Sequence, residues 1–444
     1  WNDPAIWEGV SNGETLGIFQ LEADAMTQMT KKYKPQGIKD AAVLVALNRP
    51  GVTRTGAADV FIRRRNGLEP VSTQHPLLDA VLADSLGIMV FQEQLLQAVA
   101  VLAGYSLTDA DRVRKMVGKK LQVEMREERG VFIERCIANQ AFMDGCRNRN
   151  PEKLAGEIWT MMEEAGSYLF NRAHSVSYAF MVVWGAYFKH YHPREYLTAL
   201  LQTDPENASR YVREARSRGI PILPPEINDS KSRFVLTEEG IRYGLEDVKG
   251  VGPAAVKEIL SLQLEGPFEG LADYLKRTTG RGGKKKTVVI NLISVGAFDT
   301  FGDRGQLLQD YYDSRKEKNY HIPDFKSKAT VIDLEFDLIG DYITFDPIAD
   351  YREFIEAECI QDPDDMLKAK PKEVMSIGGK ISTFKEHNAR NGLMCFLTVE
   401  CEGKEFEVTI FADSYSLYKH FIKLGSPVII EVEKLKSGVM LREL

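Results

Sequence analysis

The sequence predicts a multidomain α+β protein that is mainly helical at first and ends in a small β-barrel. Up to about residue 205, apolar residues recur at helical spacing. Between about residues 241 and 300, glycines separate short helices, and the last part of the chain holds runs rich in Val, Ile and Phe. With 444 residues, of which 44% are hydrophobic, the chain can build several cores.

Composition limits the classes of function. The formal net charge of −7 excludes a wholly basic nucleic-acid binder, so any contact with DNA must come from local basic patches. The longest apolar run, around Tyr178 to Phe188, is shorter than the roughly 20 residues of a membrane span, and we expect no membrane partner. The first residue is Trp1 and not Met, so we expect a fragment, a processed product or a truncated reading frame. No signal peptide is visible in the sequence.

The cysteines predict neither disulfides nor a zinc site. They are odd in number, irregularly spaced and contain no CxxC pair, which is typical of a reducing cytoplasm: Cys136, Cys146, Cys359, Cys395 and Cys401.

We assign residues 1–205 to a first, helical domain. "FQEQLLQAVAVLAGY" places Leu95, Val99 and Leu102 on one helical stripe, and Gly104 is a suitable stop. "PEKLAGEIWTMMEEAGSYLF" predicts another amphipathic helix with Pro151 in its first turn. The apolar helix "SVSYAFMVVWGAYFKHYHP" is closed by its terminal proline.

Residues 206–300 are predicted to form a helix-hairpin-helix domain after a proline-rich connection, "RGIPILPPEIND". In "LEDVKGVGPAAVKEIL", Gly250 and Gly252 flank Val251, and we expect a tight hairpin between two short helices. A helix N-terminus with glycines before it lets the backbone approach a phosphate. Val251 would anchor the hairpin, while Lys249 and Lys257 would add positive charge. The alternative is a tight turn whose glycines serve packing only.

A basic stretch follows the hairpin. "KRTTGRGGKKKT" carries six cations and no acid: Lys276, Arg277, Arg281, Lys284, Lys285 and Lys286. Such a run is usually a solvated loop. Beside a helix-hairpin-helix it favours contact with the same DNA backbone.

Residues 301–370 are interpreted as a polar connecting region with one or two short helices. Residues 371–444 are predicted to form an OB-type barrel from strand-like runs such as "VMSIGGKISTF" and "PVIIEVEKL". One helix, "DSYSLYKHFIKLG", lies between the third and fourth strands, with Asp413 or Ser414 as its expected cap.

The barrel is a second indication of nucleic-acid binding. OB barrels bind single strands through basic loops and stacking aromatic side chains. We expect Lys385, His387 and Arg390 in the first loop to contact single-stranded DNA. Phe396 and Phe411 are more often core residues, and a protein-interaction module is an alternative role for the barrel.

Two pairs of residues invite a metal interpretation. Asp109 and Asp111 have a spacing that holds divalent metals in strands, but their surroundings indicate a helix start, with Asp109 as cap and first-turn acid. His190 and His192 do not share a helix face. We therefore predict no metal site in this chain.

Several motifs in order resemble the bacterial DNA polymerase III alpha subunit, a family C replicative polymerase. "TLGIFQLEADAM", "LVALNRPG", "LGIMVFQEQLLQ", "AGYSLTDADRVRKMVGKK" and "FNRAHSVSYAF" are similar to its fingers region. "IRYGLEDVKGVG" and "LISVGAFD" are similar to its helix-hairpin-helix segment, and "LIGDYITFDPIADY" to its motif ahead of the OB domain. The resemblance covers nearly the whole chain.

The resemblance implies site residues. It places a set of basic residues near the incoming triphosphate or the primer–template: Arg49, Arg114, Lys115, Lys119, Lys120, Arg172 and His174. It implies that the hairpin and Lys284 to Lys286 hold duplex DNA behind the active site. Asn48 and Arg172 depart from the usual residues of the family, although Arg172 keeps the charge.

The resemblance also implies a reaction and partners. The complete enzyme would be a DNA-directed DNA polymerase, a nucleotidyltransferase whose Mg²⁺ is bound by an upstream palm, and we expect this chain alone to be inactive. Primer–template DNA, deoxynucleoside triphosphates and other replisome subunits are the implied partners. "HIPDF" lies where a sliding-clamp motif is expected but lacks its glutamine. The alternative is a non-catalytic DNA-binding protein derived from the polymerase.

Overall fold

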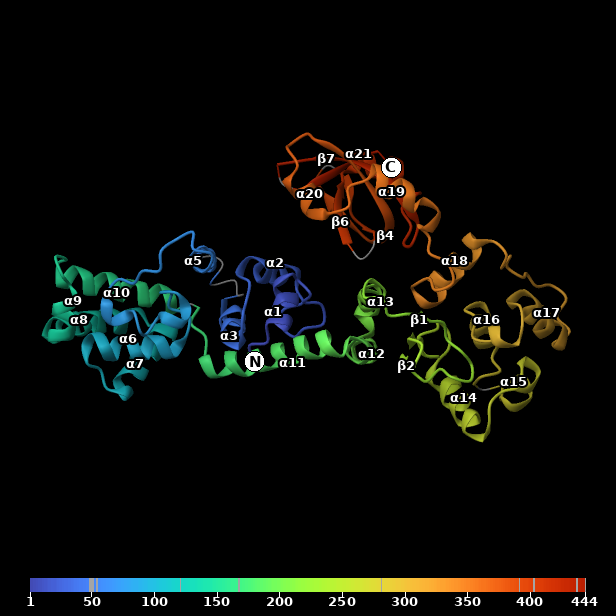
Figure 1. Cartoon of the computed structure of the whole chain (residues 1–444), viewed down its shortest axis with the longest axis horizontal. Coiled ribbons are helices and arrows are strands. Elements are labelled where there is room, and N and C mark those ends of the chain that lie inside the picture. Colours follow the sequence, from blue (N-terminus) through green and yellow to red (C-terminus); the bar gives the residue numbers. More distant parts are fainter. Residues whose placement is uncertain are drawn as a thin grey trace. The chain divides into compact units, whose positions relative to one another are not determined.

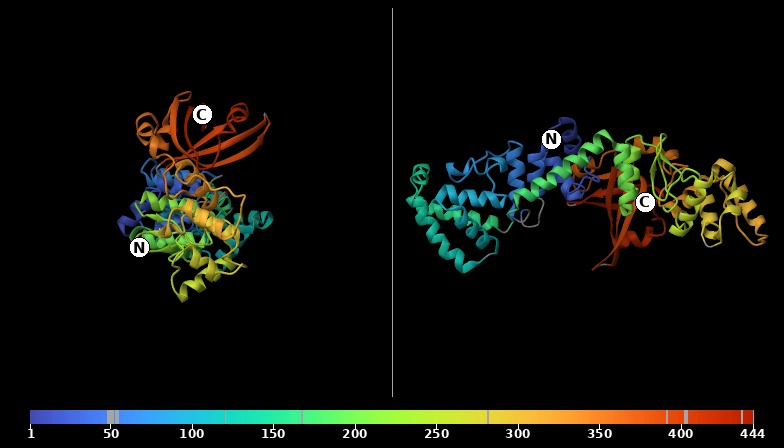
Figure 2. Two further views of the ribbon diagram at one scale, coloured as in Figure 1. Left: turned by 90° about the vertical axis from the view of Figure 1, so that its right-hand side faces the viewer. Right: turned by 90° about the horizontal axis from the view of Figure 1, so that it is seen from below.

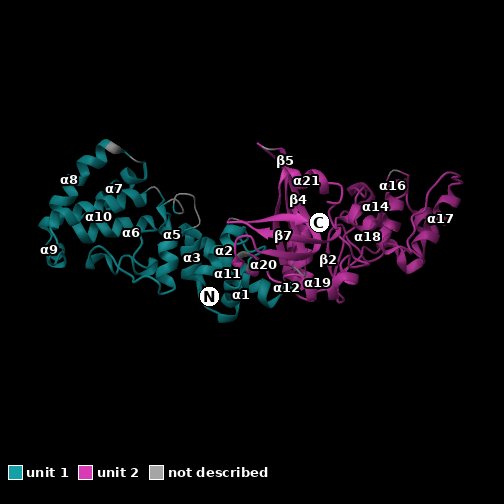
Figure 3. Ribbon diagram, turned by 90° about the horizontal axis from the view of Figure 1, so that it is seen from above, with its two compact units in different colours: residues 1–193 teal, residues 194–444 magenta. Residues whose placement is uncertain are grey.

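The chain forms two compact units, Trp1–Pro193 and Arg194–Leu444 (Figure 3). The structure is a computed structural model, and it describes all residues except 48–51, 53–54, 120, 167, 281, 391, 402–403, 437 and 444. Figure 1 labels the elements, and Figure 2 gives two further views. None of the helices in the described ranges is both long and apolar enough to cross a bilayer.

The first unit is helical and has two cores. One core joins the first helices to the long α11: α1 (Pro4–Ser11), α2 (Asp24–Tyr33), α3 (Ile38–Leu47), α5 (Ala57–Arg65) and α11 (Arg172–Tyr191). The other is built from α6 (Gln92–Ala103), α7 (Leu107–Lys119), α8 (Gln122–Ala138), α9 (Gln140–Gly145) and α10 (Pro151–Gly166). Short 3-10 helices, Pro76–Leu78 and Ala83–Ser85, connect the two.

Helix boundaries in this unit follow local signals. Gly104 ends α6 in the left-handed conformation with φ +64°, as predicted. Pro151 is the first residue of α10, also as predicted. Asp109 lies in the first turn of α7, as predicted. The prediction that Asp109 also caps this helix is wrong, because the Ser106 hydroxyl accepts from the Asp109 amide at 3.2 Å.

The second unit begins with α12 (Pro193–Thr203) and α13 (Ala208–Ser217), followed by a three-stranded sheet. Its strands are β1 (Ile222–Leu223), β2 (Val235–Leu236) and β3 (Ile241–Arg242). Their order is β1-β3-β2, with β1 parallel and β2 antiparallel to β3. Between β3 and the hairpin glycines the chain forms turns, so the expected first helix of the hairpin is not present in this described segment.

The helices that follow share one core. They are α14 (Pro253–Glu265), α15 (Leu271–Arg277), α16 (Lys286–Ser294), α17 (Arg304–Ser314) and α18 (Lys328–Ile339). Two shorter helices, α19 (Arg352–Glu358) and α20 (Pro363–Lys368), lead into the barrel. The described residues between 301 and 370 thus hold more helix than the one or two short helices expected.

The chain ends in a closed five-stranded barrel, in the order β4-β5-β6-β8-β7. Its elements are β4 (Val374–Ala389), β5 (Gly392–Cys401), β6 (Lys404–Ile410), α21 (Ala412–Tyr418), β7 (Pro427–Lys434) and β8 (Val439–Glu443). The predicted OB-type barrel with one helix between its third and fourth strands is confirmed. The predicted cap is wrong, because Phe411 is the N-cap and Asp413 lies in the first turn.

Truncating Phe132 should test the core of α6–α10. Phe132 is fully buried, and its ring centroid lies 5.2 Å from that of Trp159. Phe132→Ala should lower the free energy of unfolding by about 3–5 kcal/mol through lost burial and a cavity. The neighbouring Val131 is 40% exposed, so Val131→Ala should stay within about 0.5 kcal/mol. Urea denaturation followed by circular dichroism measures both, and equal losses would contradict this core.

Candidate nucleic-acid interface

The turn before α14 is fixed by the elements around it. The Lys249 amide donates to the Leu338 carbonyl oxygen at 2.7 Å, at the end of α18. The Lys249 carbonyl oxygen accepts from Asn291 Nδ2 of α16 at 2.6 Å. Val251 is buried, and its amide donates to the Val248 carbonyl oxygen at 3.0 Å. The turn is therefore anchored in the core through Val251.

Three amides of the same segment face solvent. Among the described residues, the amides of Gly250, Gly252 and Ala254 donate to no protein acceptor, and all three residues are exposed. Gly252 is the N-cap of α14, and Pro253, its first residue, has no amide hydrogen. Because unpaired amides at a helix N-terminus carry partial positive charge, the Gly252 and Ala254 amides can bind an anion.

The two hairpin glycines have different structural demands. Gly250 has φ +83°, and a Cβ there would lie 3.0 Å from both Asn291 Nδ2 and Thr287 Cγ2. Gly252 has an ordinary extended conformation, φ −87° and ψ 169°, and nothing lies within 4 Å of an added Cβ. A Cβ at Gly252 would therefore leave the turn undisturbed. A side chain there would only occupy the space in front of the amides.

One carboxylate holds the basic loop against α14. Glu258 accepts from the Thr279 amide at 2.6 Å and from the Gly283 amide at 2.7 Å. Burial acts to raise the pKa of Glu258, but these amide hydrogen bonds outweigh it and the pKa is lowered. A Cβ on Gly282 would lie 3.3 Å from the Ala254 carbonyl oxygen. The loop therefore packs on the same first turn of α14 that presents the free amides.

The predicted duplex-contacting lysines are all exposed, and one of them has a carboxylate partner. Lys249, Lys257, Lys284 and Lys285 are exposed. Lys286 is also exposed, but it pairs with Glu317 at 2.6 Å, and this hydrogen bond raises the pKa of Lys286.

Two further arginines belong to the same basic stretch. Arg277 donates to the carbonyl oxygens of Leu262 and Gly266 at 2.5 and 3.0 Å, so it serves the fold. Arg281 lies outside the described residues.

In the first unit, two predicted arginines meet at the first turn of α6. Arg114 of α7 donates from Nη1 to Gln92 Oε1 at 3.1 Å. The Arg172 amide donates to Glu93 Oε2 at 2.9 Å, and its guanidinium lies 5.4 Å from the centroid of the Phe91 ring. Arg114 and Arg172 come from distant parts of the sequence, so the fold brings them together.

Carboxylates already partner these arginines. Arg114 Nη2 lies 2.8 Å from Asp111 Oδ1, and Lys115 Nζ lies 2.8 Å from Asp111 Oδ2. These hydrogen bonds, from Lys115 first and then Arg114, lower the pKa of Asp111. Arg172 pairs with Asp84. Asp111 thus orients basic side chains.

The other predicted residues of the first unit are less organised. Lys119 is exposed at the end of α7, and His174 is exposed with its ring centroid 4.1 Å from that of Tyr178. Arg49 and Lys120 lie outside the described residues, as does Asn48. Within the described part of the chain, no three His, Cys, Asp or Glu side chains gather as metal ligands.

The barrel places its candidates on a strand. Strand β4 runs through Ala389, so Lys385 and His387 lie on it, and only Arg390 lies in the turn, which corrects the expected loop. Lys385 pairs across the strands with Phe396, and His387 with Met394.

The two barrel phenylalanines named from the sequence are exposed. Phe396 and Phe411 are 47% and 45% exposed, so the expectation that they are core residues is wrong. The His387 and Phe396 ring centroids lie 6.1 Å apart. Lys385, His387 and Phe396 therefore share one exposed face.

The segment at His321 to Phe325 contributes to the protein's own fold. Ile322 and Phe325 pack against the core of α14–α18. They are partly buried there, while His321 and Asp324 are exposed.

Comparisons with known proteins agree with this organisation. Residues 1–140 match the finger domain of the bacterial DNA polymerase III alpha subunit, and residues 219–307 match a helix-hairpin-helix motif. The DNA polymerase III subunit alpha of Aquifex aeolicus is 32% identical over 446 residues, covering 97% of this chain and 37% of that protein. The corresponding subunit of Thermus aquaticus is 32% identical over 471 residues, covering 98% and 38%. That of Bacillus subtilis is 30% identical over 455 residues, covering 96% and 40%. The chain thus spans about two fifths of the length of these relatives.

The two hairpin glycines should respond differently to an added methyl group. Gly250→Ala should lower the free energy of unfolding by about 1–3 kcal/mol, because alanine is strained at positive φ and meets Asn291 and Thr287. Gly252→Ala should change it by less than about 0.5 kcal/mol, because the site is open. Thermal and urea denaturation of both variants measure this difference. A larger loss for Gly252→Ala than for Gly250→Ala would contradict the geometry of the turn.

Proposed function

The chain belongs to the family of bacterial DNA polymerase III alpha subunits, and we propose that it binds DNA and the incoming nucleotide for such a replicative polymerase. The observation that carries the proposal is the set of free amides at the N-terminus of α14, next to an exposed basic loop. DNA-directed nucleotidyl transfer uses divalent metal ions held by carboxylates. We assign no metal ligand to the described residues.

The duplex contact is proposed at the turn and the loop together. A phosphate oxygen would accept from the Gly252 and Ala254 amides, and Gly250 would lie beside it. The hydrogen bonds of Glu258 to the loop amides keep Lys284 and Lys285 beside this turn. These lysines would neutralise neighbouring phosphates. Because phosphates and amides carry no base information, binding should be independent of sequence.

The nucleotide contact is proposed at the first turn of α6. Arg114 and Arg172 would bind phosphate oxygens of the triphosphate or of the primer–template, with Lys115 adding charge. Their present partners, Asp111 and Asp84, show that both guanidiniums can hold an anion. A phosphate, with its higher charge, would replace these carboxylates.

A single-strand contact is proposed on the barrel. The observation that favours it is the exposed face of Phe396 with Lys385 and His387. An aromatic ring stacks on any base, and cations beside it hold the backbone. A non-catalytic DNA-binding protein would keep the duplex and single-strand contacts, and only the kinetics of a complete polymerase separate the two functions.

Duplex binding should depend on the turn and on the loop lysines. Gly252→Ala should weaken duplex affinity by roughly tenfold, because the methyl group blocks hydrogen bonds to a charged phosphate. Replacing Lys284 and Lys285 together with Ala should flatten the salt dependence by roughly one unit of slope per lost phosphate contact. Fluorescence anisotropy with duplex DNA at several salt concentrations measures both effects.

The matched control removes two exposed lysines elsewhere in the same unit. Lys419→Ala combined with Lys423→Ala changes the net charge equally and should leave duplex affinity and salt slope nearly unchanged. If the control and both test variants bind duplex DNA like the unsubstituted chain, the turn is not the binding site.

The arginines of the first unit should affect nucleotide use. In a complete polymerase that carries this chain, Arg114→Ala should lower kcat/KM for the nucleotide by roughly tenfold or more, about 1.4 kcal/mol of transition-state stabilisation. Arg126→Ala, an exposed arginine on α8, is the control and should have little effect. Steady-state primer extension measures both. Unchanged kinetics for Arg114→Ala and Arg172→Ala combined would refute the assignment.

A further inference from the structure

The second unit contains a junction between two cores that the proposed DNA contacts do not use. Leu338 and Ile339, at the end of α18, pack against the core of the helix-hairpin-helix region. Gly340 ends α18 with φ +71°, and Ile348 already belongs to the core of the barrel. Asp341 and Tyr342 therefore lie where the chain passes from one core to the other.

Asp341 is tied to the helix-hairpin-helix side of this junction. Its Oδ1 accepts from Arg216 Nη1 of α13 at 3.0 Å, and its Oδ2 accepts from the Tyr243 hydroxyl at 3.1 Å. Arg216 Nη2 also donates to the Tyr342 carbonyl oxygen at 2.5 Å. Asp341 is only 8% exposed. Three separate segments thus meet at one buried carboxylate.

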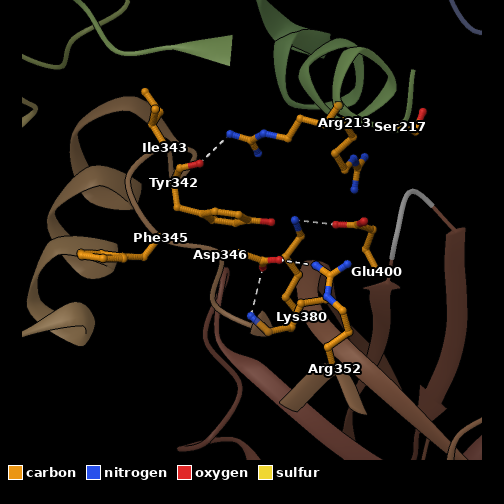
Figure 4. A pocket seen from close by; sticks show the side chains of 11 residues that line it. Arg213, Ser217, Tyr342, Ile343, Phe345, Asp346, Arg352, Lys380 and Glu400 are labelled. Atoms are coloured by element: carbon orange, nitrogen blue, oxygen red, sulfur yellow. Dashed lines mark hydrogen bonds and ion pairs between the residues drawn. The ribbon is translucent and has the colours of Figure 1, made fainter. Parts of the chain in front are cut away.

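The Tyr342 ring extends this network to the barrel (Figure 4). Arg216 lies 5.1 Å from the ring centroid, and Lys380 Nζ of β4 lies 4.2 Å from it. Lys380 in turn pairs with the buried Glu400 of β5 at 2.7 Å. A cation therefore contacts the ring from each side of the junction. We call these six residues the joint: Arg216, Tyr243, Asp341, Tyr342, Lys380 and Glu400.

Two further contacts cross the same junction. Arg213 Nη2 of α13 lies 2.8 Å from Glu405 Oε1 of β6. A Cβ on Gly425, just before β7, would lie 2.9 Å from Phe336 Cδ2 of α18, so these elements approach closely.

The charges of the joint depend on one another. Burial raises the pKa of Asp341 against the lowering effect of Arg216, and burial lowers the pKa of Lys380 against the raising effect of Glu400. Removing one partner would leave a buried charge uncompensated.

A cavity beside the joint is lined by further charged side chains, of which Arg352 pairs with Asp346 at 2.7 Å. Each arginine and lysine that lines this cavity faces a carboxylate, so we assign the cavity to the joint and not to an anion site.

We propose that the joint locks the barrel onto the helix-hairpin-helix body, so that the duplex contact and the exposed barrel face act on one DNA at a fixed spacing. The fixed attachment of the barrel, the mechanical part of the proposal, follows from the contacts above. The binding of one DNA by both sites, the DNA part, rests on the proposed function. Two linked sites at fixed spacing convert the second binding event into an intramolecular one. A duplex with a single-stranded overhang should then bind more tightly than duplex or single strand alone.

The mechanical part is tested by a distance measurement between the two bodies. Lys257 of α14 and Lys419 beside α21 are exposed, and the five native cysteines are buried. Lys257→Cys and Lys419→Cys therefore accept spin labels selectively, and double electron–electron resonance gives the distribution of distances between them. With the joint intact, this distribution should be narrow.

The joint variants separate the ring from the charge. Tyr342→Leu keeps much of the volume but removes the π-system, and Asp341→Asn keeps the shape but removes the charge; each should broaden the distribution. Tyr342→Phe keeps the ring and should leave it narrow, as should Phe345→Ala, a partly buried side chain of the same cavity. Circular dichroism checks that each variant is folded. A broad distribution with the joint intact, or a narrow one in both Tyr342→Leu and Asp341→Asn, would overturn the proposal.

The DNA part has a separate readout. Tyr342→Leu should weaken binding of a duplex with an overhang by about tenfold, while affinities for plain duplex and for single strand stay unchanged. If plain duplex fails to bind even the unsubstituted chain, the proposed function fails while the distance test still decides the joint. If plain duplex binds but Tyr342→Leu does not change the affinity for the duplex with an overhang, the proposed coupling between the two DNA contacts is refuted.

Discussion

The proposed duplex-binding turn of the second unit depends on one backbone constraint, the left-handed conformation of Gly250. With φ +83°, the chain reverses in the space left by Asn291 and Thr287, where a side chain would not fit. The reversal sends Val251 into the core and leaves the next amides at the surface. The same turn is bonded to α16 and α18 through Lys249. The direction of the free amides is thus set by the packing of several helices.

The basic side chains of the candidate sites are concentrated locally, although the protein as a whole is acidic. The net charge is −7, yet the loop next to α14 exposes lysines and is held by Glu258, an acid that faces inward to amides. In the first unit, Asp111 and Asp84 orient the arginines at α6. Glu258 therefore holds the loop without facing the proposed phosphate, whereas Asp111 and Asp84 bind the two guanidinium groups that a phosphate would take over. This arrangement explains how an acidic chain can offer basic contacts to DNA.

The sequence predicted the parts of the fold that depend on local signals. Gly104 and Pro151 mark helix ends through their own backbone preferences, and alternating apolar residues predicted the barrel strands. The turn at Gly250 was predicted for the same reason. The resemblance to the alpha subunits, which the comparisons confirm, rested on motifs spread along the chain. The roles of the named site residues remain predictions.

Features that depend on distant contacts were missed. The sequence around the hairpin does not reveal that a Cβ at Gly252 would meet open space. Nor does it reveal that a Cβ at Gly250 would meet Asn291 and Thr287 of α16. The exposure of Phe396 follows from which face of β5 turns outward, and the apolar residue type alone indicated a core. Glu258 accepts hydrogen bonds from the amides of Thr279 and Gly283, which lie 21 and 25 positions further along the chain. Helical periodicity could not predict these contacts.

The response of individual amides to duplex DNA tests the proposed phosphate contact at the turn most directly. Selective ¹⁵N labelling of glycine, alanine and valine, with transverse-relaxation-optimised NMR, resolves the amides of Gly252, Ala254 and Val251. Saturating duplex should shift the Gly252 and Ala254 amide protons downfield, because a phosphate oxygen accepts from both amides. The Val251 amide, bonded to the Val248 carbonyl oxygen, should change little. Unshifted Gly252 and Ala254 signals in a chain saturated with duplex would contradict the proposed phosphate contact.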